Sequence, residues 1–191
     1  MQKRKVAVIF QGIGYNIDKP LLYYSKKIAS EHGYDVIVVE FNGIDKGSLK
    51  DKDTILSAFD LAVSLAEEQL KEEDFSSCED IIFVSKSIGT VAASVYAAKH
   101  DIPAGQVYYT PFPQTFSHAK EGNGIVFFGD KDPWVEPDTI RDLCISKNIR
   151  YRIIEGGNHS LETGHVSVDV ENMNNTIREV EDYFDKNHFR E

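Results

Sequence analysis

Six short runs of β-branched and aromatic residues recur along this chain, and segments with helical spacing separate them. The runs are 6–10, 36–40, 81–84, 106–109, 125–128 and 151–154. The first five are nearly continuous in apolar residues, which is typical of strands buried on both faces of a parallel sheet, and the sixth is typical of an edge strand. Because strand and helix alternate, the pattern predicts an α/β fold: a three-layer α/β/α sandwich with a mostly parallel sheet of about six strands.

Five segments carry apolar residues at helical spacing. The stripe of the first is Leu21, Leu22, Ser25, Ile28 and Ala29, and that of the second is Ile55, Phe59, Ala62, Ala66 and Leu70. The others are the alanine-rich 90–99, the short 139–146, and 172–185, with Ile177, Val180, Tyr183 and Phe184 facing inward. In parallel sheets covered on both faces, ligands bind beyond the carboxyl ends of the strands, so function is expected in the loops that follow them.

Length and charge exclude several function classes. The 191 residues suffice for one domain with its own core, so we expect 1–191 to form a single domain. A net charge of −10 opposes nucleic-acid binding. The apolar run after Lys3-Arg4-Lys5 is too short for an export signal, and no stretch approaches the roughly 20 apolar residues of a membrane helix. We expect a cytoplasmic protein without nucleic-acid or membrane partners. Cys78 and Cys144 fit no metal spacing, and neither a metal nor a cofactor is expected.

The loops at the strand ends supply a serine, an acid and a histidine. Ser87, in VSKSIGT (84–90), lies between a strand and a helix, and its neighbours Ser85 and Gly89 are small enough for a tight turn that exposes a nucleophile. The Ile88 N–H at the helix start can stabilise an oxyanion. The alternative is that Ser87 only caps the helix.

Two later loops complete the set. His159 follows a strand and a Gly-Gly pair, and it has a pKa suited to accepting the serine proton. Asp132 follows the strand at 125–128 and would orient that histidine. Asp130 is a rival for this role, although it could equally brace the loop. We favour Asp132, because Pro133 stiffens the turn just after it.

These three loops together resemble the α/β-hydrolase family. Ser-Lys-Ser-Ile-Gly resembles its nucleophile elbow Gly-x-Ser-x-Gly, Gly-Asp-Lys-Asp-Pro-Trp-Val its acid loop and Gly-Gly-Asn-His-Ser its histidine loop, in the family's order. The resemblance implies a catalytic triad of Ser87, Asp132 and His159. It also implies an oxyanion hole formed by the backbone N–H groups of Ile13 and Ile88.

The chain also departs from that family. Ser85 replaces the first glycine of the elbow, and Gln11 replaces the usual histidine of the oxyanion loop. The resemblance implies a hydrolase fold that lacks the first two strands. The expected fold also lacks a cap domain, because the segment 110–124 is too short to form one. The plan is similar to that of dienelactone-hydrolase-like proteins and other small serine hydrolases.

The resemblance implies a serine hydrolase that cleaves an ester-type bond (carboxylester, thioester or lactone) of a small acyl substrate. Near the site, four aromatic residues would form a substrate wall or, alternatively, pack in the core: Tyr15, Tyr109, Phe112 and Trp134. Lys86 would attract an acidic substrate or lie solvated beside the nucleophile. A non-catalytic binding or scaffold protein on the same fold stays open as the alternative function. A dinucleotide site at Gly12-Ile13-Gly14 is weak, because Ile17 occupies the place of the third glycine.

Overall fold

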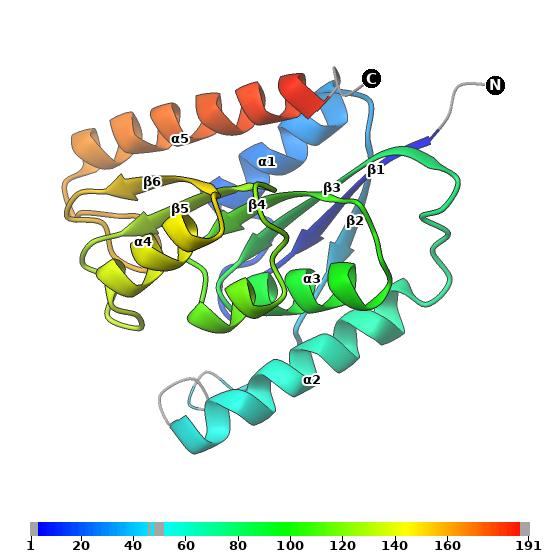
Figure 1. Ribbon diagram of the computed structural model, residues 1–191. Coiled ribbons are helices and arrows are strands. Elements are labelled where there is room, and N and C mark those ends of the chain that lie inside the picture. The colour runs from blue at the N-terminus through cyan, green and yellow to red at the C-terminus, as the bar shows by residue number, and fades with distance from the viewer. Residues whose placement is uncertain (1–3, 46, 48–51, 188–191) are drawn as a thin grey trace.

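The computed structural model describes residues 4–45, 47 and 52–187, with the backbone alone described at 52, 53 and 187. Lys3 of the basic cluster lies outside the described residues. The fold is an α/β sandwich around one six-stranded sheet (Figure 1). The predicted α/β fold is therefore confirmed.

All six predicted strands are present, and every strand pairing is parallel. The strands are β1 (Arg4–Phe10), β2 (Asp35–Val39), β3 (Cys78–Lys86), β4 (Gly105–Tyr109), β5 (Ile125–Gly129) and β6 (Arg150–Ile154), in the order β2-β1-β3-β4-β5-β6. The prediction of an edge position is correct for β6. The prediction that the second run is buried on both faces is wrong, because β2 forms the other edge and most of it is only partly buried.

Helices cover both faces of the sheet (Figure 1). They are α1 (Pro20–Glu31), α2 (Lys52–Leu70), α3 (Ile88–Lys99), α4 (Pro137–Ser146) and α5 (Val166–Asn187), with a short 3-10 helix, η2 (Pro113–Ser117). Helices α1 and α5 lie on one face, and α2, α3 and α4 lie on the other. The three layers were predicted, and η2 was not.

Alternation along the strands divides the core between the two faces. In β1, Val6, Val8 and Phe10 pack with α2 and α3, while Ala7 and Ile9 pack with α1 and α5. Successive side chains of a strand point to opposite faces, so an unbroken apolar run is required when both faces are covered.

Helix α5 begins at Val166, six residues before the predicted start at 172. The added turns hold Val166, Val168 and Val170, which alternate with polar residues, a strand-like pattern that hides the helical period. The Asp169 carboxylate accepts hydrogen bonds from the backbone N–H and the hydroxyl of Thr163, both at 2.6 Å, and so ties the preceding loop to the first turn.

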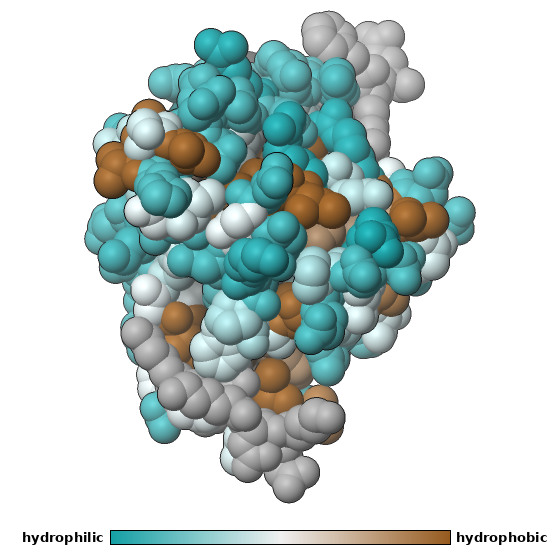
Figure 2. Space-filling model, turned by 90° about the vertical axis from the view of Figure 1, so that its left-hand side faces the viewer, coloured by the Kyte–Doolittle hydropathy of each residue, from teal (hydrophilic) through white to brown (hydrophobic). Residues whose placement is uncertain are grey.

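Because all strands are parallel, their carboxyl ends meet at one edge, to which the arrowheads point in Figure 1. Figure 2 looks onto this side of the molecule, where hydrophobic patches are separated by hydrophilic ones. The connection between β4 and β5, which would hold a cap domain, contains η2 and no larger element. In the part of the chain that the structure describes, no helix is both long and apolar enough to cross a membrane.

Candidate active site

Ser87 sits on a strained turn between β3 and α3, with φ 56° and ψ −124°. Few side chains adopt this region, and such strain is retained where the surrounding packing enforces it. At Gly89, an added Cβ would lie 2.4 Å from the carbonyl oxygen of Gln11. The start of α3 therefore packs so close to the end of β1 that only glycine fits at this position. Ser85 is fully buried, and its hydroxyl donates to the Val107 carbonyl at 3.2 Å. The serine at this position therefore leaves no buried polar group unpaired.

The three predicted loops bring their side chains into one hydrogen-bonded chain. His159 Nε2 lies 2.8 Å from Ser87 Oγ, and His159 Nδ1 lies 2.6 Å from Asp132 Oδ2. With Asp132 ionised, the imidazole Nδ1–H donates to the carboxylate, which leaves Nε2 to accept the Ser87 proton. The Ser87 side chain makes no cap hydrogen bond to α3, so the capping alternative is wrong.

The two candidate acids have different partners. The Asp132 side chain has no exposed surface, and its second oxygen accepts the Trp134 backbone N–H at 2.9 Å. The Asp130 carboxylate instead accepts the Gly156 backbone N–H at 2.6 Å and so joins the acid loop to the histidine loop. Asp130 is thus a brace, and Asp132 is the acid that contacts His159.

Burial governs the protonation of His159, whose side chain is 20% exposed. Desolvation lowers the pKa of His159, and the nearby charge of Lys86 lowers it further, while Asp132 opposes both effects. The net direction is downward, so the imidazole stays neutral at neutral pH and can accept a proton.

The loop after β1 packs directly against the elbow. An added Cβ at Gly12 would lie 3.1 Å from Lys86 Cγ and 3.4 Å from Ser87 Cβ. The backbones of Gly12 and Tyr15 exchange two hydrogen bonds, of 3.0 and 3.1 Å, that close this loop. Within the described residues, the N–H groups of Ile13 and Ile88 have no protein acceptor, which leaves them available to a ligand. Their role in an oxyanion hole stays a prediction.

The four aromatic residues predicted near the site separate into two groups. The rings of Phe112 and Trp134 flank His159, with centroids 6.1 and 5.9 Å from the imidazole. Tyr109 has no exposed surface, and its hydroxyl lies 2.9 Å from that of Ser25. The Tyr15 hydroxyl accepts the Leu21 backbone N–H at 3.2 Å. Tyr109 is thus a core residue, and Tyr15 fixes the start of α1.

Sequence reasoning missed a buried hydroxyl network behind the elbow. The Thr90 hydroxyl donates to the Ser87 carbonyl at 2.7 Å and lies 2.7 Å from the Thr115 hydroxyl. Ser94, one turn after Thr90, donates to the Thr115 carbonyl at 2.7 Å. The available signal was a pair of hydroxyl residues, four apart, in an otherwise apolar alanine-rich helix.

The other correction concerns Lys86, which is neither solvated nor free to meet a substrate. Its side chain is only 1% exposed, and its ammonium lies in the interior. The apolar run at 81–84 ends before Lys86, so the sequence pattern does not indicate that this lysine is buried.

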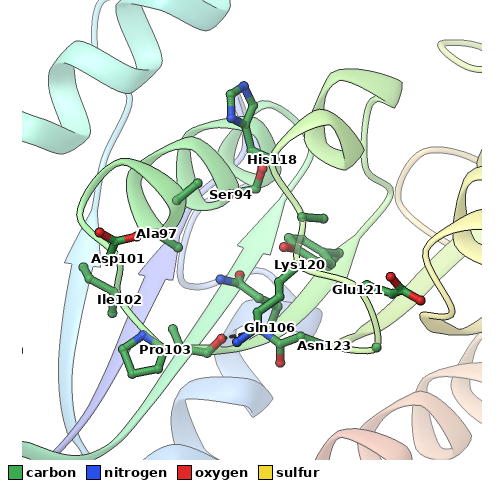
Figure 3. A pocket seen from close by; sticks show the side chains of 15 residues that line it. Ser94, Ala97, Asp101, Ile102, Pro103, Gln106, His118, Lys120, Glu121 and Asn123 are labelled. Carbon is green, nitrogen blue, oxygen red and sulfur yellow. Dashed lines mark hydrogen bonds between the residues drawn. The ribbon is translucent and has the colours of Figure 1, made fainter.

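The protein also contains a hollow of about 520 Å³. Figure 3 shows side chains that line it, among them Ser94, Gln106 and Asn123. Its walls come from the end of α3, the start of β4 and the segment 118–123. Because Gln106 lies at the start of β4 whereas Ser87 follows the carboxyl end of β3, this hollow lies at the opposite edge of the parallel sheet. It is therefore distinct from the candidate active site.

Residues 54–171 match the model of the family described as "Alpha/beta hydrolase family", and this span includes Ser87, Asp132 and His159. The chain belongs to the alpha/beta hydrolase family. No curated protein sequence matches this hydrolase.

Solved structures similar to this alpha/beta hydrolase share its fold at low sequence identity. Est1E from Butyrivibrio proteoclasticus has a TM-score of 0.65 at 12% identity, covering 98% of this chain and 89% of its own. The Pyrococcus furiosus esterase Pf2001 has a TM-score of 0.65 at 12% identity, with 96% and 83% covered. A serine hydrolase without a lid from Xanthomonas campestris has a TM-score of 0.57 at 13% identity, with 94% and 83% covered. At these identities the likeness concerns the fold.

Proposed function

We propose that this alpha/beta hydrolase is a serine hydrolase that cleaves an ester-type bond of a small substrate through an acyl-enzyme. The bond would be a carboxylester, a thioester or a lactone. The observation that carries the proposal is the hydrogen-bonded chain from Ser87 Oγ through His159 to Asp132, with the serine on a strained turn.

Each group has one role in this reaction. Ser87 Oγ bonds to the acyl carbon while its proton passes to His159 Nε2, and Asp132 stabilises the imidazolium. The oxyanion accepts hydrogen bonds from the Ile13 and Ile88 N–H groups. The bond to the leaving group then breaks, and His159 returns the proton to that group. Water next attacks the acyl-enzyme, gives one proton to His159, and releases the acid as Ser87 recovers its hydrogen.

The surroundings of His159 favour an uncharged apolar group in the substrate. Phe112 and Trp134 flank the imidazole, and Lys86 directs its charge into the interior. Est1E, one of the similar structures, has been solved with ferulic acid bound. We propose that an aromatic or short alkyl acyl group is accepted here, packed against the partly exposed Trp134, since Phe112 is only 2% exposed.

A fluorophosphonate probe tests the enzyme proposal, because it labels only an activated serine. Labelling of the wild-type protein and its loss in Ser87→Ala are expected. Ser64→Ala is the matched control, because Ser64 is on α2 and its hydroxyl donates only to its own helix at Asp60. That control should label like the wild type. A folded wild-type protein that takes no label would refute the proposal and favour a binding or scaffold protein.

Turnover of an ester panel then tests the substrate class. We expect hydrolysis of p-nitrophenyl acetate, p-nitrophenyl butyrate and methyl ferulate, with Trp134→Ala raising KM for the ferulate most. Equal KM values in the wild type and Trp134→Ala would contradict the proposed wall.

A further inference from the structure

Lys86 ends β3 one residue before Ser87 and turns its charge inward. The side chain is 1% exposed, and a lysine is almost never so deeply buried unless its ammonium is paired. Its Nζ donates to the backbone carbonyl of His159 at 2.7 Å and to the Thr110 hydroxyl at 2.5 Å. The Tyr15 ring lies on another side, with its centroid 5.1 Å from Nζ. Three loops of the carboxyl edge therefore meet at this one ammonium.

The acceptor of one of these bonds belongs to the histidine of the proposed triad itself. The hydrogen bonds to Ser87 and Asp132 fix the imidazole ring of His159, and the bond from Lys86 fixes its main chain. Since Lys86 and Ser87 are adjacent, the bond ties the histidine loop to the elbow. The distance between Ser87 Oγ and His159 Nε2 therefore depends both on the hydrogen bonds of the imidazole ring and on the hydrogen bond from Lys86 to the His159 main chain.

The same ammonium acts on the imidazole electrostatically. Burial lowers the pKa of Lys86 to about 7, and Asp132 opposes this. The charge of Lys86 is the second cause, after burial, of the lowered pKa of His159. Among the described residues, the ionisable groups that face this cluster are Asp132 from the loop after β5, His159 from the loop after β6, and Tyr15 from the loop after β1. Tyr15 stays neutral, because burial raises its pKa to about 12.

We propose that Lys86 is a positioning residue of the site: its buried ammonium holds the His159 main chain beside Ser87 and places a positive charge close to the imidazole. The proposal rests on the proposed hydrolase function for its kinetic consequences. The contact between Lys86 and His159 does not depend on turnover, so the positioning role can be tested by itself.

The first experiment follows the His159 ring by NMR as pH is varied, with its signals assigned by comparison with His159→Gln. In Lys86→Met, the loss of a nearby positive charge should raise the pKa of His159. Lys26→Met is the matched control, since Lys26 is exposed on α1 and its removal changes the net charge equally. In that control the pKa of His159 should not move. An unchanged titration of His159 in a folded Lys86→Met variant would overturn the proposal.

Kinetics provide a second readout on p-nitrophenyl butyrate. Loss of the main-chain link should reduce kcat roughly 10- to 100-fold, because small displacements of catalytic groups have effects of this size. KM should change little, and the acid limb of the pH profile should move to higher pH. A reduced kcat with an unmoved acid limb would overturn the electrostatic part, and an unchanged kcat would overturn the positioning part.

The wild-type protein supplies a test if Lys86→Met fails to fold. The ε-methylene signal of Lys86 and the ring signal of His159 should each show an inflection where the other group titrates. Two titrations without this coupling would overturn the proposal. Absence of fluorophosphonate labelling in the wild type would refute the hydrolase function alone, because the coupling is measured without a substrate.

Discussion

Replacing Asp132 with asparagine tests the assignment of the acid most directly, since the change keeps the side-chain shape. The carboxylate accepts two hydrogen bonds, one from His159 Nδ1–H at 2.6 Å and one from the Trp134 backbone N–H at 2.9 Å. An asparagine has only one carbonyl oxygen. If that oxygen stays on Trp134, the amide NH2 faces His159 Nδ1 and forces the imidazole proton onto Nε2, which then points at Ser87.

The wrong tautomer cannot accept the serine proton, so the general base is lost although the geometry remains. We expect Asp132→Asn to reduce kcat by roughly three to four orders of magnitude, which corresponds to about 4–5.5 kcal/mol of activation free energy. In the other amide orientation, two N–H donors face each other at Trp134, and this should also destabilise the acid loop.

The assay is the steady-state hydrolysis of p-nitrophenyl butyrate, and Asp130→Asn is the matched control. An asparagine at 130 keeps a carbonyl oxygen for the Gly156 N–H, so its kcat should stay within about threefold of the wild type. Circular dichroism establishes that both variants are folded. If Asp130→Asn abolishes turnover and Asp132→Asn does not, the reasoning from hydrogen-bond partners is refuted.

Three further results are expected. Gly89→Ala should destabilise the fold by about 1–3 kcal/mol and lower activity, because its Cβ would lie 2.4 Å from the Gln11 carbonyl oxygen; thermal unfolding measures this, and an unchanged Tm would contradict it. Because burial lowers the pKa of His159, kcat/KM should stay high at pH 6.5 and fall only at lower pH, as the imidazole of the folded protein becomes protonated. An acid limb above pH 6.5 would contradict the effect of burial on His159. Thr90→Val removes the donor to the Ser87 carbonyl and should cost about 1 kcal/mol of stability with a lower kcat, whereas equal unfolding and turnover would argue that the network does not support the elbow.

The fold could be predicted well because its signals are local. Apolar runs of four or five residues and stripes at helical spacing located all six strands and all five helices. The misjudged elements were β2, whose apolar run lies at an edge, and the start of α5, where alternating valines imitate a strand. An apolar run indicates that a strand is buried, but it does not indicate which strands lie beside it. Whether a strand is central or at an edge depends on the strand order in the sheet.

The site could be predicted in part for a similar reason. Ser87, Asp132 and His159 follow strands, and parallel strands bring their following loops to one edge, so the residue types and their order already indicated a meeting point. The choice between Asp132 and Asp130 was different. Only Lys131 separates them in the sequence, and the directions of the two side chains depend on the loop that each carboxylate contacts.

The sequence alone determined the alternation of strands and helices, the small residues around Ser87 and the presence of three reactive side chains on loops of one sheet edge. Only the tertiary structure decided that Lys86 is buried against His159 and that Tyr109 belongs to the core. The hydrogen bonds of these two side chains reach residues more than 20 positions away. For Lys86 the partner carbonyl is 73 residues distant, and no local pattern records it.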